Sequence, residues 1–206
     1  MTSLTRSLSE ANMSTILSEI ESLYRTHPRA SVTSTLTSLL LTILSAEQSL
    51  LDTFVILHAG FVAALYRIMG TDFCAFLVQT LVERFESIHH KSGKENTNLV
   101  AFLSELYNFG VVGAGLIYDL IRMFLETLNE IDTELLLKMI QSKQSCSSNK
   151  VDAIDSGQQL RQDDPSALKE IVILMQSKVS EVPPESLRYF VPSVSVLMKC
   201  TNKVYD

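Results

Sequence analysis

The chain contains few residues that interrupt a helix. Its 206 residues include only 7 glycines and 5 prolines. A β-sandwich or a β-barrel needs a turn after every few residues, and tight turns depend strongly on Gly and Pro. Hydrophobic residues make up 46% of the chain and charged residues 19%, which is typical of a globular domain. We therefore predict an all-α protein built from long helices.

Apolar residues recur at the spacing of an amphipathic helix. In the first such segment Met13, Ile16, Ile20 and Leu23 fall on one face. The same analysis predicts helices over residues 9–24, 32–44, 49–69, 73–88, 98–109, 114–128, 132–142, 165–179 and 185–199. Pro192 should kink or split the last of these.

Polar residues and glycines mark the expected helix ends. Four residues are predicted to cap the start of a helix: Ser9, Ser31, Asp132 and Asp164. Pro165 follows Asp164 at the first helical position, which suits a residue that has no backbone N–H. Gly70 and Gly110 are predicted to end helices.

The helix pairs recur at a spacing of roughly 40 residues, which is typical of HEAT-like repeats. We predict one domain over residues 1–206, a HEAT-like stack of antiparallel helix pairs (an α-solenoid). A compact helical bundle is the alternative, and periodicity alone does not exclude it. A polar, Ser-rich stretch at about 143–157 is expected to be a flexible insertion.

The charge balance favours a protein partner. The net charge is −6, whereas domains that hold nucleic acid through phosphate contacts are usually basic. Cys74, Cys146 and Cys200 are odd in number and far apart, so we expect neither a disulfide nor a zinc site. The most apolar run, residues 54–66, is shorter than a membrane span and is interpreted as a buried helix.

No set of residues indicates catalysis, a metal or a cofactor. His89 and His90 are interpreted as surface residues of a loop, and His58 as a core residue bonded to the backbone. The adjacent Asp163 and Asp164 start a helix and point apart, unlike the facing carboxylates of a hydrolase. We predict that the chain is not an enzyme and takes no small-molecule substrate.

Several segments resemble one known family. They are Asn98–Phe109 (NLVAFLSELYNF), Leu116–Ile121 (LIYDLI), Leu160–Ile171 (LRQDDPSALKEI) and, more weakly, residues 7–13 and 20–24. Together they resemble the middle domain of eukaryotic translation initiation factor 4G, a HEAT-type domain. The sequences of these segments are most similar to those of the nucleolar members of that family, and the resemblance covers nearly the whole chain.

The resemblance implies a partner and a pathway. Domains of this family clamp DEAD-box RNA helicases of the initiation factor 4A type, contact both helicase lobes and stimulate ATP turnover. The nucleolar members serve small-subunit (18S) ribosomal RNA processing, which implies a location in the nucleus and nucleolus. The alternatives are the same fold in pre-mRNA splicing or translation initiation, and direct binding of RNA, such as pre-ribosomal RNA.

The resemblance also implies two helicase-binding edges. One is the start of the first helix, with Ser9, Glu10 and Asn12. The other is the turn that carries Arg161, Asp163 and Asp164. The polar insertion lengthens the chain before the second edge and could shift it. Because the nucleolar members continue into a further helical domain, we expect this chain to be a fragment of a longer protein.

Overall fold

The structure, a computed structural model, describes residues 8–46, 48–89, 91, 93–141, 160 and 162–202. These residues form nine α-helices and one 3-10 helix, and none of them lies in a strand. They group into two compact units, residues 1–111 and 112–206, which are described one at a time. The predicted all-α fold class is confirmed. The insertion predicted at about 143–157 lies outside the described residues.

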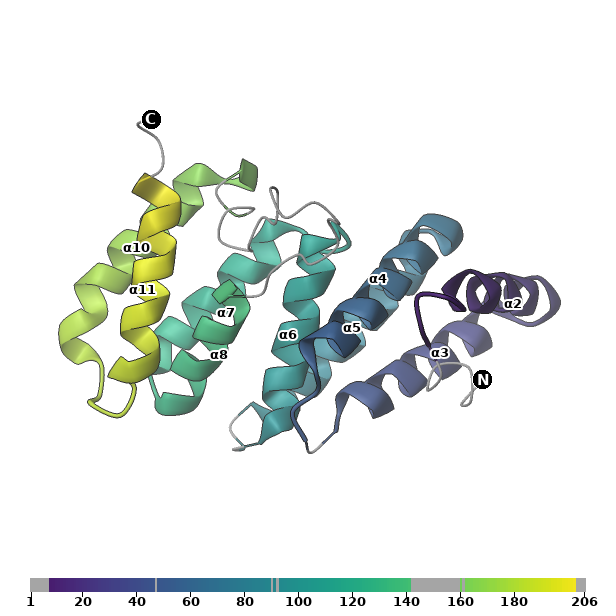
Figure 1. The fold of residues 1–206 in the computed structure, drawn as a ribbon, viewed down its shortest axis with the longest axis horizontal. Coiled ribbons are helices and arrows are strands. Elements are labelled where there is room, and N and C mark those ends of the chain that lie inside the picture. The colour runs from purple at the N-terminus through teal and green to yellow at the C-terminus, as the bar shows by residue number, and fades with distance from the viewer. Residues whose placement is uncertain are drawn as a thin grey trace. The chain divides into compact units, whose positions relative to one another are not determined.

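The described residues of the first unit form five α-helices. They are α2 (Met13–Thr26), α3 (Arg29–Leu44), α4 (Asp52–Met69), α5 (Thr71–Ile88) and α6 (Lys94–Asn108). Helix α4 packs against α2, α5 and α6, and α3 packs against α2, α5 and α6. Gly70 alone links α4 to α5, and the two helices double back on one another and pack together (Figure 1).

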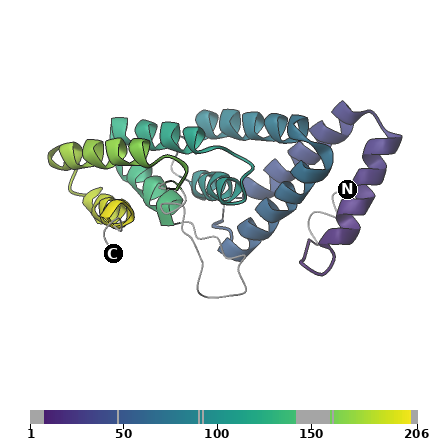
Figure 2. The ribbon, with the colours of Figure 1, turned by 90° about the horizontal axis from the view of Figure 1, so that it is seen from above.

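In the part of the second unit that the structure describes, there are four α-helices and the 3-10 helix. They are α7 (Ala114–Thr127), α8 (Glu130–Gln141), α10 (Pro165–Lys178), η1 (Val179–Glu181) and α11 (Leu187–Asn202). Helix α11 packs against both α8 and α10, and α7 packs against the same two helices. The view from above shows α10 and α11 side by side (Figure 2). Helix α11 runs through Pro192 without a split.

The predicted glycine stops are confirmed. Gly70 has φ 90° and ends α4. Gly110 has φ 71°, its N–H donates to the Tyr107 carbonyl at 2.8 Å, and the Val111 N–H donates to the Leu106 carbonyl at 2.9 Å. This pair of bonds is a Schellman motif, which satisfies the last carbonyls of α6 and needs the left-handed backbone that glycine adopts readily.

Two of the predicted caps are misplaced by a few residues. Helix α2 begins at Met13, with Asn12 rather than Ser9 as its N-cap residue. Helix α3 begins at Arg29, before the predicted cap Ser31. Pro28 precedes this helix with φ −57°, a value that its ring fixes and that suits a helix start, and no side chain caps the helix. The capping of α10 by Asp164 is confirmed.

The start of α8 reverses the predicted capping. The Asn129 side-chain oxygen accepts from the Asp132 N–H at 2.8 Å, so Asn129 performs the capping that was predicted for Asp132. The Asp132 carboxylate, which is fully buried, accepts in return from the Asn129 amide at 2.9 Å and from the Thr127 hydroxyl. The pair resembles a capping box, except that the printed return bond comes from the Asn129 side-chain amide, whereas a capping box uses the backbone N–H of the N-cap residue.

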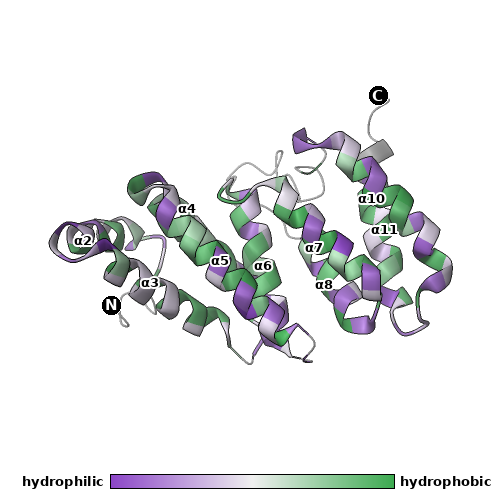
Figure 3. Ribbon diagram, turned by 180° about the vertical axis from the view of Figure 1, so that it is seen from behind, coloured by the Kyte–Doolittle hydropathy of each residue, from purple (hydrophilic) through white to green (hydrophobic). Residues whose placement is uncertain are grey.

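Helix α4 supplies much of the core of the first unit. It has 18 residues and a mean hydropathy of 1.4, so it is long and apolar enough to cross a membrane by those two criteria alone. Its buried face, which includes Phe61 and Leu65, packs on the neighbouring helices, which supports the interpretation as a core helix. Helix α7 in the second unit instead carries both hydrophobic and hydrophilic colours along its ribbon (Figure 3).

The two histidine predictions have different outcomes. His58 is confirmed as a core residue, since it is 1% exposed and its Nδ1 lies 2.8 Å from the Phe54 carbonyl oxygen. The prediction that His89 lies at the surface is wrong, because its ring is buried beside Phe85 at a centroid distance of 5.2 Å. The residue directly follows α5, and the amphipathic pattern of that helix continues through it. His90 lies outside the described residues.

Candidate functional site

The first candidate edge is a closed turn in front of α2. The Ser9 carbonyl accepts from the N–H groups of Asn12 at 3.2 Å and Met13 at 3.0 Å. In the other direction, the Asn12 side-chain oxygen accepts from the Ser9 N–H at 2.8 Å. Ser9 and Glu10 are exposed and Asn12 is half-buried. Asn12 therefore holds the turn in shape, while Glu10 presents a carboxylate at the surface.

The second candidate edge is the turn that begins α10. Asp164 accepts with Oδ1 from the N–H groups of Ser166 at 3.1 Å and Ala167 at 2.9 Å. Asp163 and Asp164 are both exposed. Capping fixes only one oxygen of Asp164 in these bonds, so the carboxylate of this residue also remains open to a partner. The third predicted residue of this edge, Arg161, lies outside the described residues.

A buried tyrosine anchors the second edge from α7. The Tyr118 hydroxyl lies 2.8 Å from the Asp164 carbonyl oxygen and 3.2 Å from the Leu160 carbonyl oxygen. Tyr118 is 3% exposed. Since a hydroxyl has one proton, it donates to these two carbonyls as a shared hydrogen bond. This contact ties the start of α10 to α7 and holds the two aspartates in place.

The surroundings of Tyr118 keep its hydroxyl protonated. Burial raises the pKa of Tyr118 well above 10.0, because the phenolate loses solvation, and the nearby carboxylates of Asp164 and Asp163 raise it further. Arg122 acts in the opposite direction and more weakly. The hydroxyl is therefore a permanent donor at neutral pH, so the anchor does not titrate under physiological conditions.

The chemistry of the two edges suits recognition. Both present carboxylates on backbone turns that are closed by their own hydrogen bonds. Within the described part of the chain there is no group of three or more His, Cys, Asp or Glu residues that could hold a metal ion. Burial raises the pKa of the Cys74 thiol to about 11, so this thiol stays protonated and unreactive at neutral pH.

The sequence did not reveal the role of Tyr118. Its place among Ile117, Leu120 and Ile121 predicts burial on the apolar face of a helix. Its hydrogen-bond partners lie 42 and 46 residues further along the chain. Helical periodicity carries no information about contacts at that separation. The one available signal is that a buried Tyr hydroxyl needs a partner.

The two edges lie in different compact units. Ser9, Glu10 and Asn12 belong to the first unit, and Asp163 and Asp164 to the second. The described structure therefore brings residues together within each edge. Their joint action on one partner stays a prediction.

These features define an all-α, HEAT-like domain whose exposed polar turns are suited to binding a partner. The chain belongs to the MIF4G domain family, whose match covers residues 1–200. The resemblance to the middle domain of initiation factor 4G and to its nucleolar members is thereby confirmed.

Individual relatives are named for the nucleolus or for a yeast phenotype. The chain is 42% identical over 201 residues to suppressor of glycerol defect protein 1 of Schizosaccharomyces pombe. The matched region covers 92% of this chain and 24% of that protein. It is 32% identical over 175 residues to human nucleolar MIF4G domain-containing protein 1, which covers 84% of this chain and 19% of that protein. The chain thus spans about a quarter or less of the length of these relatives.

Proposed function

We propose that this chain is a non-enzymatic scaffold that binds a DEAD-box RNA helicase of the initiation factor 4A type and stimulates its ATP turnover. Its proposed setting is small-subunit (18S) ribosomal RNA processing in the nucleolus. The observation that carries the proposal is membership of the MIF4G family together with relatives whose names include the word nucleolar. In this scheme the helicase hydrolyses ATP, and the scaffold holds the two helicase lobes in one relative orientation.

The physical basis is differential affinity. A helicase with two mobile lobes interconverts between arrangements, and a scaffold shifts this equilibrium only as far as it binds one arrangement more tightly than the other. Two separate edges, each contacting one lobe, would give such a preference. The turn at Glu10 and the turn at Asp163 and Asp164 are the proposed edges, and their carboxylates suit a basic helicase surface.

The preformed shape of the edges supports this role. Asn12 closes the first turn, and Asp164 and Tyr118 hold the second. A turn that is already ordered before binding loses little conformational entropy in the complex. Rigid presentation is what a clamp needs, because flexible edges would follow both lobe arrangements equally well.

The test is a binding assay of this chain against purified DEAD-box helicases, with their ATPase rates measured in parallel. We expect selective binding and faster turnover with one helicase of the initiation factor 4A type. The identity of that helicase would separate ribosome maturation from splicing or translation. Absence of binding to every helicase of this type would refute the proposal.

Charge-reversal variants assign the surface. Glu10→Lys and Asp163→Lys should each weaken helicase binding by about 1–3 kcal/mol, the range of a lost charge-assisted contact. Glu86→Lys is the matched control, because Glu86 is an exposed carboxylate on α5 that belongs to neither edge. Equal weakening by the control would show that only the net charge matters.

A further inference from the structure

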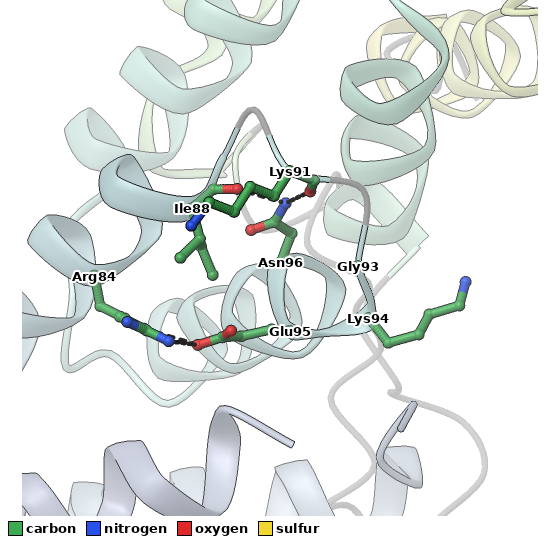
Figure 4. Close-up of a pocket in the computed structure, with 7 residues that line it drawn as sticks. All are labelled: Arg84, Ile88, Lys91, Gly93, Lys94, Glu95 and Asn96. Atoms are coloured by element: carbon green, nitrogen blue, oxygen red, sulfur yellow. Dashed lines mark hydrogen bonds and ion pairs between the residues drawn. The ribbon is translucent and has the colours of Figure 1, made fainter. Parts of the chain in front are cut away.

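A polar pocket lies where α5 meets α6 in the first unit, and none of its lining residues belongs to either proposed edge. It has a volume of about 430 Å³. Its lining residues are Arg84, Ile88, Lys91, Gly93, Lys94, Glu95 and Asn96. All of them belong to the first compact unit. Figure 4 shows these side chains around the start of α6.

One wall of the pocket holds a buried acceptor with no partner. The Asn96 side-chain oxygen makes no hydrogen bond, although the residue is only 2% exposed. Buried polar atoms are nearly always paired, so an orphan of this kind calls for an explanation. The oxygen lies on the pocket side of Asn96, away from the loop that its amide nitrogen contacts (Figure 4).

The orientation of the Asn96 amide is fixed by its other half. Its Nδ2 lies 2.8 Å from the Lys91 carbonyl oxygen and 3.3 Å from those of Ile88 and His89. Exchanging nitrogen and oxygen would set the amide oxygen against these three acceptors, so the amide cannot flip. The orphan oxygen is therefore left to accept from a donor outside the chain, either water or a ligand.

The same pocket is positively charged. The Arg84 guanidinium is paired with the Glu95 carboxylate at 2.7 Å, so these two charges balance. Lys91 is exposed and makes no ion pair within the described part of the chain. Helix α6 adds its N-terminal dipole, since its N-cap residue Gly93 has no side chain that could cap it. The surplus charge is positive in a chain whose net charge is −6.

A ligand that uses both features of this pocket brings a hydrogen-bond donor for Asn96 and an anion for Lys91, close together. An acidic residue within a peptide has both groups, a backbone N–H and a carboxylate. Single-stranded RNA fits less well. Its bases need an aromatic platform to stack on, and no ring is among the residues that line this pocket.

We propose that this pocket is a second binding site, which takes an acidic peptide segment of a protein partner. A backbone N–H of the segment donates to the Asn96 oxygen, and a neighbouring carboxylate pairs with the Lys91 ammonium. The peptide enters beside Ile88, after the exposed Lys91 side chain moves aside. The site is independent of the proposed helicase contacts, because it shares no residue with either edge.

The test is a titration of the ¹⁵N-labelled chain, followed by NMR, with a short acidic peptide such as acetyl-Gly-Asp-Glu-Asp-Gly-amide. We expect shifts of the Asn96 side-chain amide and of the backbone amides of residues 94–96. An Asn-Gln-Asn peptide should bind at least about ten-fold more weakly, because it lacks the charge. A peptide with backbone esters at the three acidic residues keeps the carboxylates but lacks those N–H donors, and should bind about five-fold more weakly.

Two variants locate the site. Lys91→Glu should weaken binding of the acidic peptide about ten-fold, while Lys91→Arg should bind nearly as well. The Lys91 carbonyl that Asn96 contacts is unchanged in both variants, so the loop keeps its hydrogen bonds. Lys169→Glu is the control, since it makes the same charge change at an exposed site on α10.

Several results would overturn the proposal. One is the absence of shifts at these resonances up to about 5 mM peptide, the weak limit of specific binding. Another is an ester peptide that binds as well as its amide counterpart, because Asn96 would then have no role. A third is an oligouridylate that shifts the same resonances when the peptide does not. Loss of helicase binding by the edge variants has no bearing on this site.

Discussion

Replacing Tyr118 with Phe tests the anchor of the second edge. The change removes one hydroxyl and leaves the ring in place. Both carbonyls that the hydroxyl contacts keep a backbone donor, since the Leu160 oxygen accepts from the Asp164 N–H at 2.9 Å and the Asp164 oxygen from the Leu168 N–H at 3.1 Å. No buried group is orphaned, so the loss of stability should be about 1 kcal/mol, the net value of one hydrogen bond.

The same variant should change the response to alkaline pH. Because the pKa of Tyr118 is raised above 10.0 in the folded chain, its contribution to stability is fully present below pH 10. Above that pH the unfolded chain releases the phenolic proton while the folded chain keeps it. The contribution then falls by up to about 1.4 kcal/mol per pH unit. The stability difference between wild type and variant should therefore vanish within about one pH unit.

The assay is urea unfolding of Tyr118→Phe and wild type, followed by circular dichroism, near neutral pH and above pH 10. Burial also raises the pKa values of Tyr24 and Cys74, but these groups are present in both chains and cancel in the difference. Tyr24→Phe is the control, since its hydroxyl bonds Thr33 at 2.8 Å in the other unit. Both variants should lose stability, and Tyr118→Phe alone should weaken helicase binding. A Tyr118→Phe variant with unchanged stability and unchanged pH dependence would refute the anchoring role.

Three further predictions separate local structure from partner contact. Asp164→Ala should lower the free energy of unfolding by about 1 kcal/mol, because the α10 cap is lost. Asp164→Ser should keep the cap and weaken only the binding of the helicase. Urea unfolding measures the first effect and a binding titration the second. Equal affinity of Asp164→Ser and wild type would restrict Asp164 to capping. Arg161→Glu should weaken helicase binding by about 1–3 kcal/mol and leave the fold intact, and unchanged binding would remove this edge from the interface. Gly70→Ala should lower the unfolding free energy by about 1–3 kcal/mol, because Gly70 has φ 90° and ψ −171°. Gly113→Ala should have little effect, because Gly113 has φ −82°. Equal thermal stability of the two variants would contradict this prediction.

The proposed edges show how far local sequence patterns reach. The capping of α10 by Asp164 was predicted correctly, because a cap involves neighbours two and three residues away. The start of α2 was predicted three residues too early, because two residues near that helix end are both suited to capping. Ser9 is a good cap by residue type, yet the Asn12 side chain closes the turn first by accepting from the Ser9 N–H. Two residue types with similar capping preference cannot be ranked from sequence alone.

The sequence by itself determined what depends on near neighbours. The scarcity of Gly and Pro and the helical spacing of apolar residues gave the all-α class, and Gly70 and Gly110 gave two helix ends through their left-handed backbone. These features follow from backbone sterics and hydrogen bonds within one or two turns. For that reason they can be recognised without knowledge of the packing.

Only the tertiary structure decided which polar groups meet or remain unpaired. Tyr118 contacts carbonyls more than 40 residues away. The amide nitrogen of Asn96 donates to carbonyls at and just after the end of the preceding helix, and its oxygen remains unpaired. Neither outcome has a periodic signal. Both depend on how the helices pack, since packing removes water from some polar groups and sets the distances between those that remain.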